Sequence, residues 1–179
     1  MNMGKITGFT LIELLIAIVV LTILIATGVP SLMDFIKNNR LTTQANSLVI
    51  AIQVARNEAV KRGTGSVICT STDQATCSND DDWTTGWIVF SDIGQDGNLD
   101  LGGGDCVTAD CIVRTSGNIN KATLDGAGTD NIRFSPDGRT TNATATTITL
   151  TADECQHKQK RDITVTTQGH TIVSTQNCP

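Results

Sequence analysis

The stretch FTLIELLIAIVVLTILIATGV, Phe9–Val29, decides the architecture of this chain of 179 residues. Glu13 is the only formally charged residue in it. A helix rises about 1.5 Å per residue, so the stretch spans roughly 31 Å, enough to cross the hydrocarbon core of a bilayer. We therefore predict a membrane-spanning helix.

Glu13 is costly at membrane depth and should have a partner. An ionised side chain there costs on the order of 2–3 kcal/mol, less near the helix end. No basic residue lies within the stretch, but an amine at the start of a neighbouring chain would supply a cation if that chain were cut before Phe9. A signal anchor with a stray acid is the alternative. A cleaved secretory signal is disfavoured, because the apolar run is too long and ATGVPS is a weak cleavage site.

The stretch and the leader MNMGKITG before it resemble the class III signal of type IV pilins and type II secretion pseudopilins. The resemblance implies that residues 1–8 are a leader, that a prepilin peptidase cuts between Gly8 and Phe9, and that Phe9 is then N-methylated. It also implies that Glu13 pairs with the Phe9 amine of an adjacent subunit in a filament. Residues 9–30 would be the single transmembrane and filament-core helix in the inner membrane, and residues 31–179 a periplasmic pilin-like domain.

An apolar stripe at helical spacing continues beyond the membrane segment. Its members recur mostly every three or four residues: Leu32, Phe35, Ile36, Leu41, Ala45, Leu48, Val49, Ile52, Ala55, Ala59 and Val60. Gly28 and Pro30 predict a kink or local break, and Gly63 predicts the end of the helix. We predict one helix from about Phe9 to Arg62, whose second half packs on a sheet.

After Gly65 the apolar period changes to two, which is typical of strands. Seven short β-branched runs alternate with turns, at residues 66–70, 86–92, 111–115, 131–135, 147–151, 162–167 and 170–175. A long helix followed by antiparallel strands predicts an α+β fold with the helix on one sheet face. Because aromatic residues are scarce, the core should consist of Val, Ile, Leu and Ala.

Motifs along this region resemble the GspH/FimT/FimU branch of minor pilins and pseudopilins. They are NEAVKRG at 57–63, WTTGWIVFSD at 83–92, DGNLD at 96–100, IRFSPDGRTT at 132–141 and RDITVTTQGHTI at 161–172. The resemblance implies a low-copy subunit that helps initiate or cap a type IV pilus or type II secretion pseudopilus, with other major and minor pilins or pseudopilins as partners. Some FimT-type members bind DNA during natural transformation, so a DNA receptor is the alternative function.

Six cysteines, all beyond the membrane segment, predict an oxidising compartment and up to three disulfide bonds. Near neighbours would close two small loops, and the resemblance implies a third bridge at the C-terminus. The favoured pairs are Cys69–Cys77, Cys106–Cys111 and Cys155–Cys178. Because six cysteines allow 15 connectivities, the pairing stays open.

Two segments bear on ligands. Residues 92–105 place oxygen atoms at alternate positions around a glycine turn, as Ca²⁺ prefers, with Asp92, Asp96, Asn98 and Asp100. However, Gly94 occupies an expected ligand position and no glutamate closes the loop. A solvated hairpin turn is therefore favoured, as is a solvated loop for the acidic run 79–82, and no metal is predicted.

A basic cluster near the C-terminus consists of Lys158, Lys160 and Arg161. DNA-binding FimT relatives carry a Gly-Arg-x-Arg motif in the last hairpin, where this chain has Gly169-His170-Thr171-Ile172, so both arginines are absent. The basic cluster and His170 would be the contacts if DNA bound, but we predict an assembly role instead. The formal net charge of −5 gives no general attraction for nucleic acid.

Nothing in the sequence predicts an enzyme or a cofactor. Neither His157 nor His170 has a nearby serine, aspartate or cysteine arranged as a catalytic triad, and no GxGxxG, P-loop or HExxH motif occurs. A pilus and a secretion pseudopilus remain equally open, because both use the same leader and the same helix.

Overall fold

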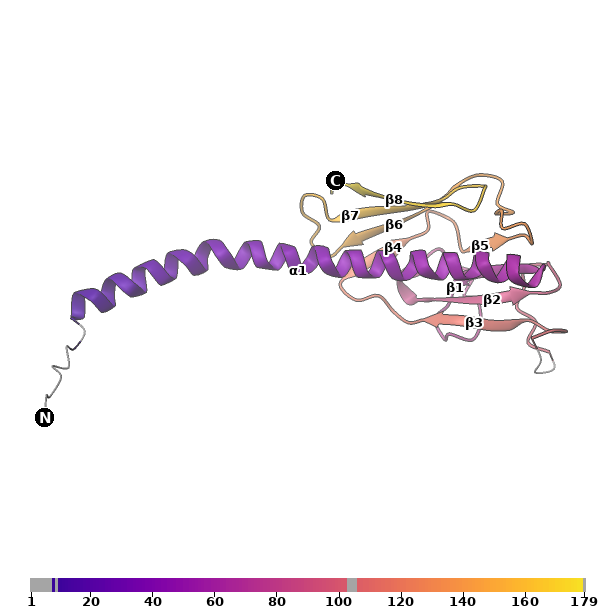
Figure 1. The fold of residues 1–179 in the computed structure, drawn as a ribbon, viewed down its shortest axis with the longest axis horizontal. Coiled ribbons are helices and arrows are strands. Elements are labelled where there is room, and N and C mark those ends of the chain that lie inside the picture. The colour runs from indigo at the N-terminus through magenta and orange to yellow at the C-terminus, as the bar shows by residue number, and fades with distance from the viewer. Residues whose placement is uncertain (1–7, 9, 103–105, 179) are drawn as a thin grey trace, which may run out of the picture. The chain divides into compact units, whose positions relative to one another are not determined.

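The computed structural model describes residue 8, residues 10–102 and residues 106–178. In these ranges a long helix precedes a 3-10 turn and eight strands, and every strand pair is antiparallel (Figure 1). The chain divides into two compact units, residues 1–38 (unit 1) and 39–179 (unit 2). The predicted α+β fold is confirmed.

Helix α1 extends from Leu11 to Arg62. Thr10 caps its start, since the Thr10 Oγ1 accepts a hydrogen bond from the Glu13 N–H at 3.3 Å. Gly63, with a φ of 67°, ends it and donates its N–H to the Ala59 carbonyl at 2.9 Å. The predicted end is confirmed, whereas the predicted start at Phe9 lies outside the described residues.

The helix is continuous across Gly28 and Pro30. The sequence predicted either a kink or a local break of the helix at Gly28 and Pro30. The prediction of a break is wrong. A single proline removes one backbone donor, and the remaining hydrogen bonds are enough to continue the helix.

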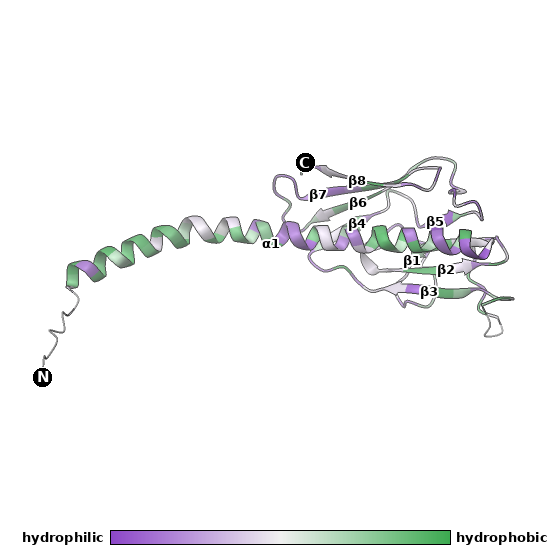
Figure 2. Ribbon diagram, viewed as in Figure 1, coloured by the Kyte–Doolittle hydropathy of each residue, from purple (hydrophilic) through white to green (hydrophobic). Residues whose placement is uncertain are grey.

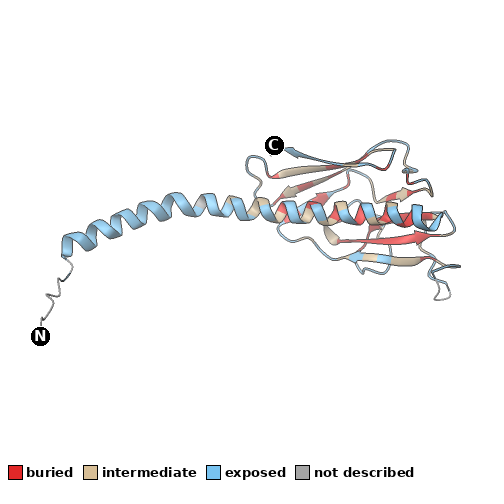
Figure 3. Cartoon of the chain, viewed as in Figure 1, coloured by how far each residue is buried: buried red, intermediate tan, exposed pale blue. Residues whose placement is uncertain are grey.

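In unit 1 the helix buries none of its apolar side chains in the chain. Leu11 is 82% exposed and Leu24 61% exposed, and the other large aliphatic residues between them are about half exposed or more (Figure 3). Figure 2 shows that hydrophobic residues predominate along this part of α1. By length and composition it is a helix that could cross a membrane.

Unit 2 contains two four-stranded sheets, where the sequence predicted one. Sheet A has the order β3-β2-β1-β5, with β1 Gly65–Thr70, β2 Trp87–Asp92, β3 Cys111–Ser116 and β5 Asn131–Phe134. Sheet B has the order β4-β6-β7-β8, with β4 Ala122–Asp125, β6 Thr146–Ala152, β7 Lys160–Val165 and β8 Thr171–Gln176. The 3-10 turn η1 is Trp83–Thr85. The sequence analysis missed β4: its residues alternate between buried and exposed, but the strand is short and Thr123 is its only β-branched residue.

One core cluster joins α1 to the inner faces of both sheets. From the predicted stripe the helix contributes Leu41, Ala45, Leu48, Ile52, Ala55 and Ala59, with Val49 partly buried against them. Ala51, which the sequence did not predict, is also buried, whereas the predicted Val60 is 54% exposed. Sheet A contributes Ile68, Val89 and Phe134 among others, and sheet B contributes Leu124, Ile148 and Ile163. Trp83 and Trp87 are also fully buried, so the core is less purely aliphatic than predicted.

Sheet A has a second apolar layer on its other face. Strands β1 and β2 are buried along their whole length, on both faces (Figure 3). Val67, Cys69, Ile88 and Phe90 form this layer, and loop residues Cys77 and Leu99 pack on it. The loop 71–82 and the loop residues 93–102 therefore cover this face of sheet A. By contrast, β8 at the edge of sheet B is mostly exposed.

Candidate functional site

The first turn of α1 holds the predicted assembly residue. The Glu13 side chain is exposed, and Thr10-Leu11-Ile12-Glu13 has the T-x-x-E spacing of a capping box. A carboxylate in this turn is also favoured by the partial positive charge of a helix N-terminus. Gly8 is exposed, and no atom lies within 4 Å of where its Cβ would be. Phe9, the other residue of the predicted cleavage site, lies outside the described residues.

Three disulfide bonds are present, with the pairs named above: Cys69–Cys77, Cys106–Cys111 and Cys155–Cys178. The first attaches the loop 71–82 to β1, and the second closes a short loop before β3. The third holds the C-terminus against the β6–β7 loop, where the Cys178 N–H also donates to the His157 carbonyl at 2.8 Å. Each bond fixes a segment that has little regular structure of its own.

Buried carboxylates hold the described loop residues 93–102, so this segment is not the simple solvated turn that the sequence favoured. Asp92 and Asp110 are only 4% and 5% exposed. Asp110 accepts hydrogen bonds from the Ile93 N–H at 2.7 Å and from the Asp100 N–H at 2.9 Å. No local pattern indicated the role of Asp110, because the groups that it binds lie 10 and 17 residues away in the sequence.

The acidic residues of this loop have different electrostatic surroundings. Burial raises the pKa of Asp92, and the nearby carboxylates of Asp110 and Asp96 add to the effect, although a hydrogen bond from the Gly97 N–H opposes it. The hydrogen bond from the Asn98 N–H lowers the pKa of the exposed Asp96. Within residues 10–102 and 106–178, no three acidic, histidine or cysteine side chains gather as a metal site. Asp92, Asp96, Asn98 and Asp100 thus serve as parts of a folded loop.

The acidic run 79–82 is exposed but ordered by specific contacts. Asp82 accepts a hydrogen bond from the Thr84 N–H at 3.0 Å and caps η1. Asp81 accepts from the Gly126 N–H through its carbonyl and from the Gly128 N–H through its carboxylate. The run therefore positions the connection between β4 and β5.

The four predicted DNA contacts do not form one patch. Lys158, Lys160 and Arg161 lie at the start of β7, whereas His170 follows the turn at the other end of the β7–β8 hairpin. At about 3.3 Å per residue, the six residues of β7 separate them by roughly 17 Å. Lys160 and Arg161 also point to opposite faces of the sheet, because side chains alternate along a strand.

The surroundings of the basic cluster reduce its positive potential further. The Arg161 Nη1 donates to the carbonyls of Lys158, at 2.7 Å, and Lys160, at 3.1 Å, so the guanidinium is turned back on its own backbone. Asp153, Glu154 and Asp162 lie within the same ten residues and balance its three positive charges. This arrangement favours neither phosphate contacts nor DNA binding.

Arg56 is a positioning residue that the sequence did not single out. Its Nε donates to the Gly138 carbonyl at 2.9 Å, and Gly138 and Gly169 belong to turns from two separate motifs. A Cβ at Gly169, where φ is 78°, would overlap the Gly138 carbonyl oxygen. The glycines of both motifs therefore allow two turns to meet over α1, which is a structural role.

Comparisons with known proteins agree with this architecture. Residues 44–169 match the family model for type II transport protein GspH, and residues 3–29 match the prokaryotic N-terminal methylation motif. Two crystal structures of the type IV minor pilin FimU from Pseudomonas aeruginosa share the fold. One has 18% identity and a TM-score of 0.53 over 74% of this chain and 91% of FimU, the other 19% and 0.57 over 78% and 92%. No curated protein matches the chain.

Proposed function

This chain belongs to the GspH family, and from that membership we propose that it is a minor pilin or pseudopilin that helps initiate or cap a filament in a type IV pilus or type II secretion system. Other pilins or pseudopilins would be its partners. Before assembly it would sit in the inner membrane through one helix, with residues 31–179 in the periplasm.

The observation that carries the proposal is the exposed apolar surface of unit 1. Large aliphatic residues from Leu11 to Val29 lie about half exposed or more around α1. Burying each such side chain is worth roughly 1.5–3 kcal/mol. A bilayer offers that burial before assembly, and helices of neighbouring subunits offer it afterwards.

We further propose that prepilin peptidase cuts between Gly8 and Phe9 and that Phe9 is N-methylated. The match of residues 3–29 to the N-terminal methylation motif supports this step. Once Phe9 is the first residue, its amine lies four residues from Glu13. The exposed Glu13 carboxylate would then pair with the Phe9 amine of the adjacent subunit, which removes the cost of an unpaired charge in the filament core.

A deletion strain complemented with variants tests the role. Deletion should lower the number of filaments by at least about tenfold while leaving their length unchanged, because initiation limits number. Glu13→Ala should be processed to Phe9, as mass spectrometry would show, yet fail to restore filaments. Asp34→Ala, a carboxylate change further along the same helix, should restore them. An unchanged filament number in the deletion strain would contradict the proposed role, and residues 1–8 on assembled protein would contradict the cleavage site.

A further inference from the structure

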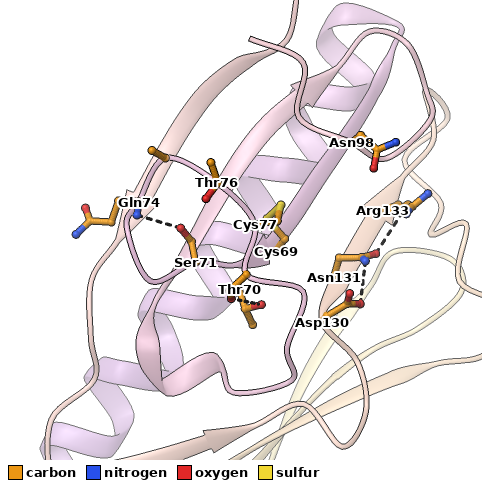
Figure 4. Close-up of a disulfide and its surroundings, with 12 residues drawn as sticks. Cys69, Thr70, Ser71, Gln74, Thr76, Cys77, Asn98, Asp130, Asn131 and Arg133 are labelled. Atoms are coloured by element: carbon orange, nitrogen blue, oxygen red, sulfur yellow. Dashed lines mark hydrogen bonds between the residues drawn. A yellow bond between two sulfur atoms is a disulfide. The ribbon is translucent and has the colours of Figure 1, made fainter.

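A pocket of about 330 Å³ opens on the outer face of sheet A, the face that α1 does not cover (Figure 4). The loop 71–82, the loop 93–102 and the edge strand β5 enclose it. Its volume lies at the lower end of the range of small-ligand sites, about 300–1,000 Å³. None of the residues proposed for processing or assembly lines this pocket.

A chain of hydrogen bonds fixes the polar wall of the pocket. Arg133 donates from Nε to the Asn131 Oδ1 at 3.3 Å, and Asn131 donates from Nδ2 to the Asp130 Oδ1 at 2.8 Å (Figure 4). The Arg133 Nη1 also donates to the Asp96 carbonyl in the facing loop, at 3.1 Å. These side chains are therefore held in place before a ligand arrives, which lowers the entropy lost on binding.

The wall presents both donors and acceptors without a net charge. A guanidinium has five N–H donors, and the bonds above engage only two of them. Asp130, whose second carboxylate oxygen is an acceptor, and Asn98, with its amide, line the same pocket. Because one positive and one negative charge offset each other, a phosphate or a metal cation is a poor fit, whereas a neutral molecule with several hydroxyl groups fits well.

The floor of the pocket is apolar and the facing loop is rigid. The Cys69–Cys77 disulfide and Leu99 lie on the second apolar layer of sheet A and also line the pocket. Gly97 has a φ of 82°, and a Cβ on it would overlap the Arg133 guanidinium. The absence of a side chain at Gly97 thus lets the loop close over Arg133, and the bond from its N–H to the Asp92 carboxylate at 3.0 Å holds it there.

We propose that this pocket binds one neutral sugar residue of a glycan. The C–H face of a pyranose ring would lie on the disulfide and Leu99, and its hydroxyl groups would bond to Arg133, Asp130 and Asn98. None of the described residues that line the pocket is aromatic, so the affinity for a free monosaccharide should be weak, about 1 mM. A side chain from a neighbouring subunit is the competing occupant.

Saturation-transfer NMR on the full chain tests the proposal, in a detergent whose head group contains no sugar. The probes are glucose, galactose, N-acetylglucosamine and N-acetylgalactosamine, and at least one should bind with Kd of about 1 mM. Arg133→Lys should weaken binding by about tenfold or more, because lysine cannot reproduce the planar fork of donors. Gly97→Ala should do the same by displacing the guanidinium.

Arg139→Lys is the matched control, since Arg139 is exposed and does not line the pocket, and it should bind as the parent chain does. If Gly97→Ala lowers the melting temperature, its loss of binding could reflect unfolding, and the test of sugar binding then rests on Arg133→Lys alone. The proposal is overturned if no probe binds below ~20 mM, or if binding survives Arg133→Lys. It is also overturned if no sugar binds while Arg133→Lys abolishes co-purification with filament subunits, because the pocket would then be a socket for another subunit.

Discussion

The two parts of α1 use apolar side chains in opposite ways. In unit 1, Leu24 is 61% exposed, and exposed hydrophobic residues predominate along the helix. In unit 2, Leu48 is fully buried, and charged residues such as Arg56 and Lys61 lie off the buried stripe. An amphipathic helix can bury its single apolar face against its own chain. A helix that is apolar on all sides must be surrounded by apolar partners, such as lipid or other helices. The part of α1 in unit 2 therefore contributes to the core, whereas the apolar part in unit 1 remains exposed within the chain.

The largest expected effect comes from truncating one leucine in each part of α1. Leu48→Ala should destabilise unit 2 by about 3–5 kcal/mol, because it leaves a cavity in a core that also holds both sheets. Leu24→Ala should change the stability of unit 2 by less than ~0.5 kcal/mol. Both tryptophans of the chain lie in the core of unit 2, so their fluorescence during urea unfolding measures each value. Equal losses of unfolding free energy in Leu48→Ala and Leu24→Ala would contradict this difference between the two parts of α1.

Removing the disulfide that holds the C-terminus, Cys155–Cys178, should destabilise unit 2 slightly less than Leu48→Ala does. Changing both Cys155 and Cys178 to serine should cost about 3 kcal/mol, mainly because the unfolded chain gains freedom over the 23-residue separation. The same fluorescence measurement applies. Peptide mapping without reduction gives the pairing directly, and a Cys155 peptide bonded to any cysteine other than Cys178 would contradict it.

A charge buried in unit 2 should give a smaller, pH-dependent effect. Because burial raises the pKa of Asp92, the folded state is penalised once the pH rises through that raised pKa, whereas in acid the carboxyl is protonated in both states. Asp92→Asn keeps an acceptor for the Gly97 N–H, so it should stabilise unit 2 near pH ~7 and lose this gain near pH ~3. Urea midpoints at both pH values test it.

Asp96→Asn provides the opposite sign as a control. The pKa of Asp96 is lowered, so its contribution to stability is present above the ordinary carboxyl pKa and is lost in acid. The variant should therefore be less stable than the parent chain near neutral pH and equal to it in acid. A gain at neutral pH in both variants would show that the loop responds to net charge alone.

The smallest expected effect is DNA binding by unit 2, which we predict to be absent at physiological salt. The full chain in detergent should give no gel shift with duplex DNA at ~150 mM salt, because few phosphates could be neutralised. Any shift at low salt should disappear when Lys158, Lys160 and Arg161 become alanine. His170→Ala should not alter it, since His170 lies at the far end of the hairpin. A micromolar affinity at ~150 mM salt would favour a DNA receptor.

Local sequence patterns predicted most helices and strands of unit 2 but missed the short strand β4. The stripe from Leu41 to Ala59 and the glycine at position 63 predicted the second half of α1 and its end. All seven predicted strands are present, because alternation and β-branched residues act over a few neighbours. Strand β4, Ala122–Asp125, alternates over only four residues and has a single β-branched residue, so it did not stand out. Gly28-Val29-Pro30 suggested a break that the helix does not have.

The sequence by itself determined α1, seven of the eight described strands and the family, because periodicity and the residues around Gly8 and Glu13 are properties of neighbouring positions. Only the tertiary structure decided that the strands form two sheets and that β1 pairs with β5. It also decided that Asp110 accepts a hydrogen bond from the loop residue Ile93, and that His170 lies far from Lys158. It also brought Gly97 onto Arg133, 36 positions apart. Contacts between distant positions depend on how all the apolar faces fill one core together, and no local stretch of sequence contains that information.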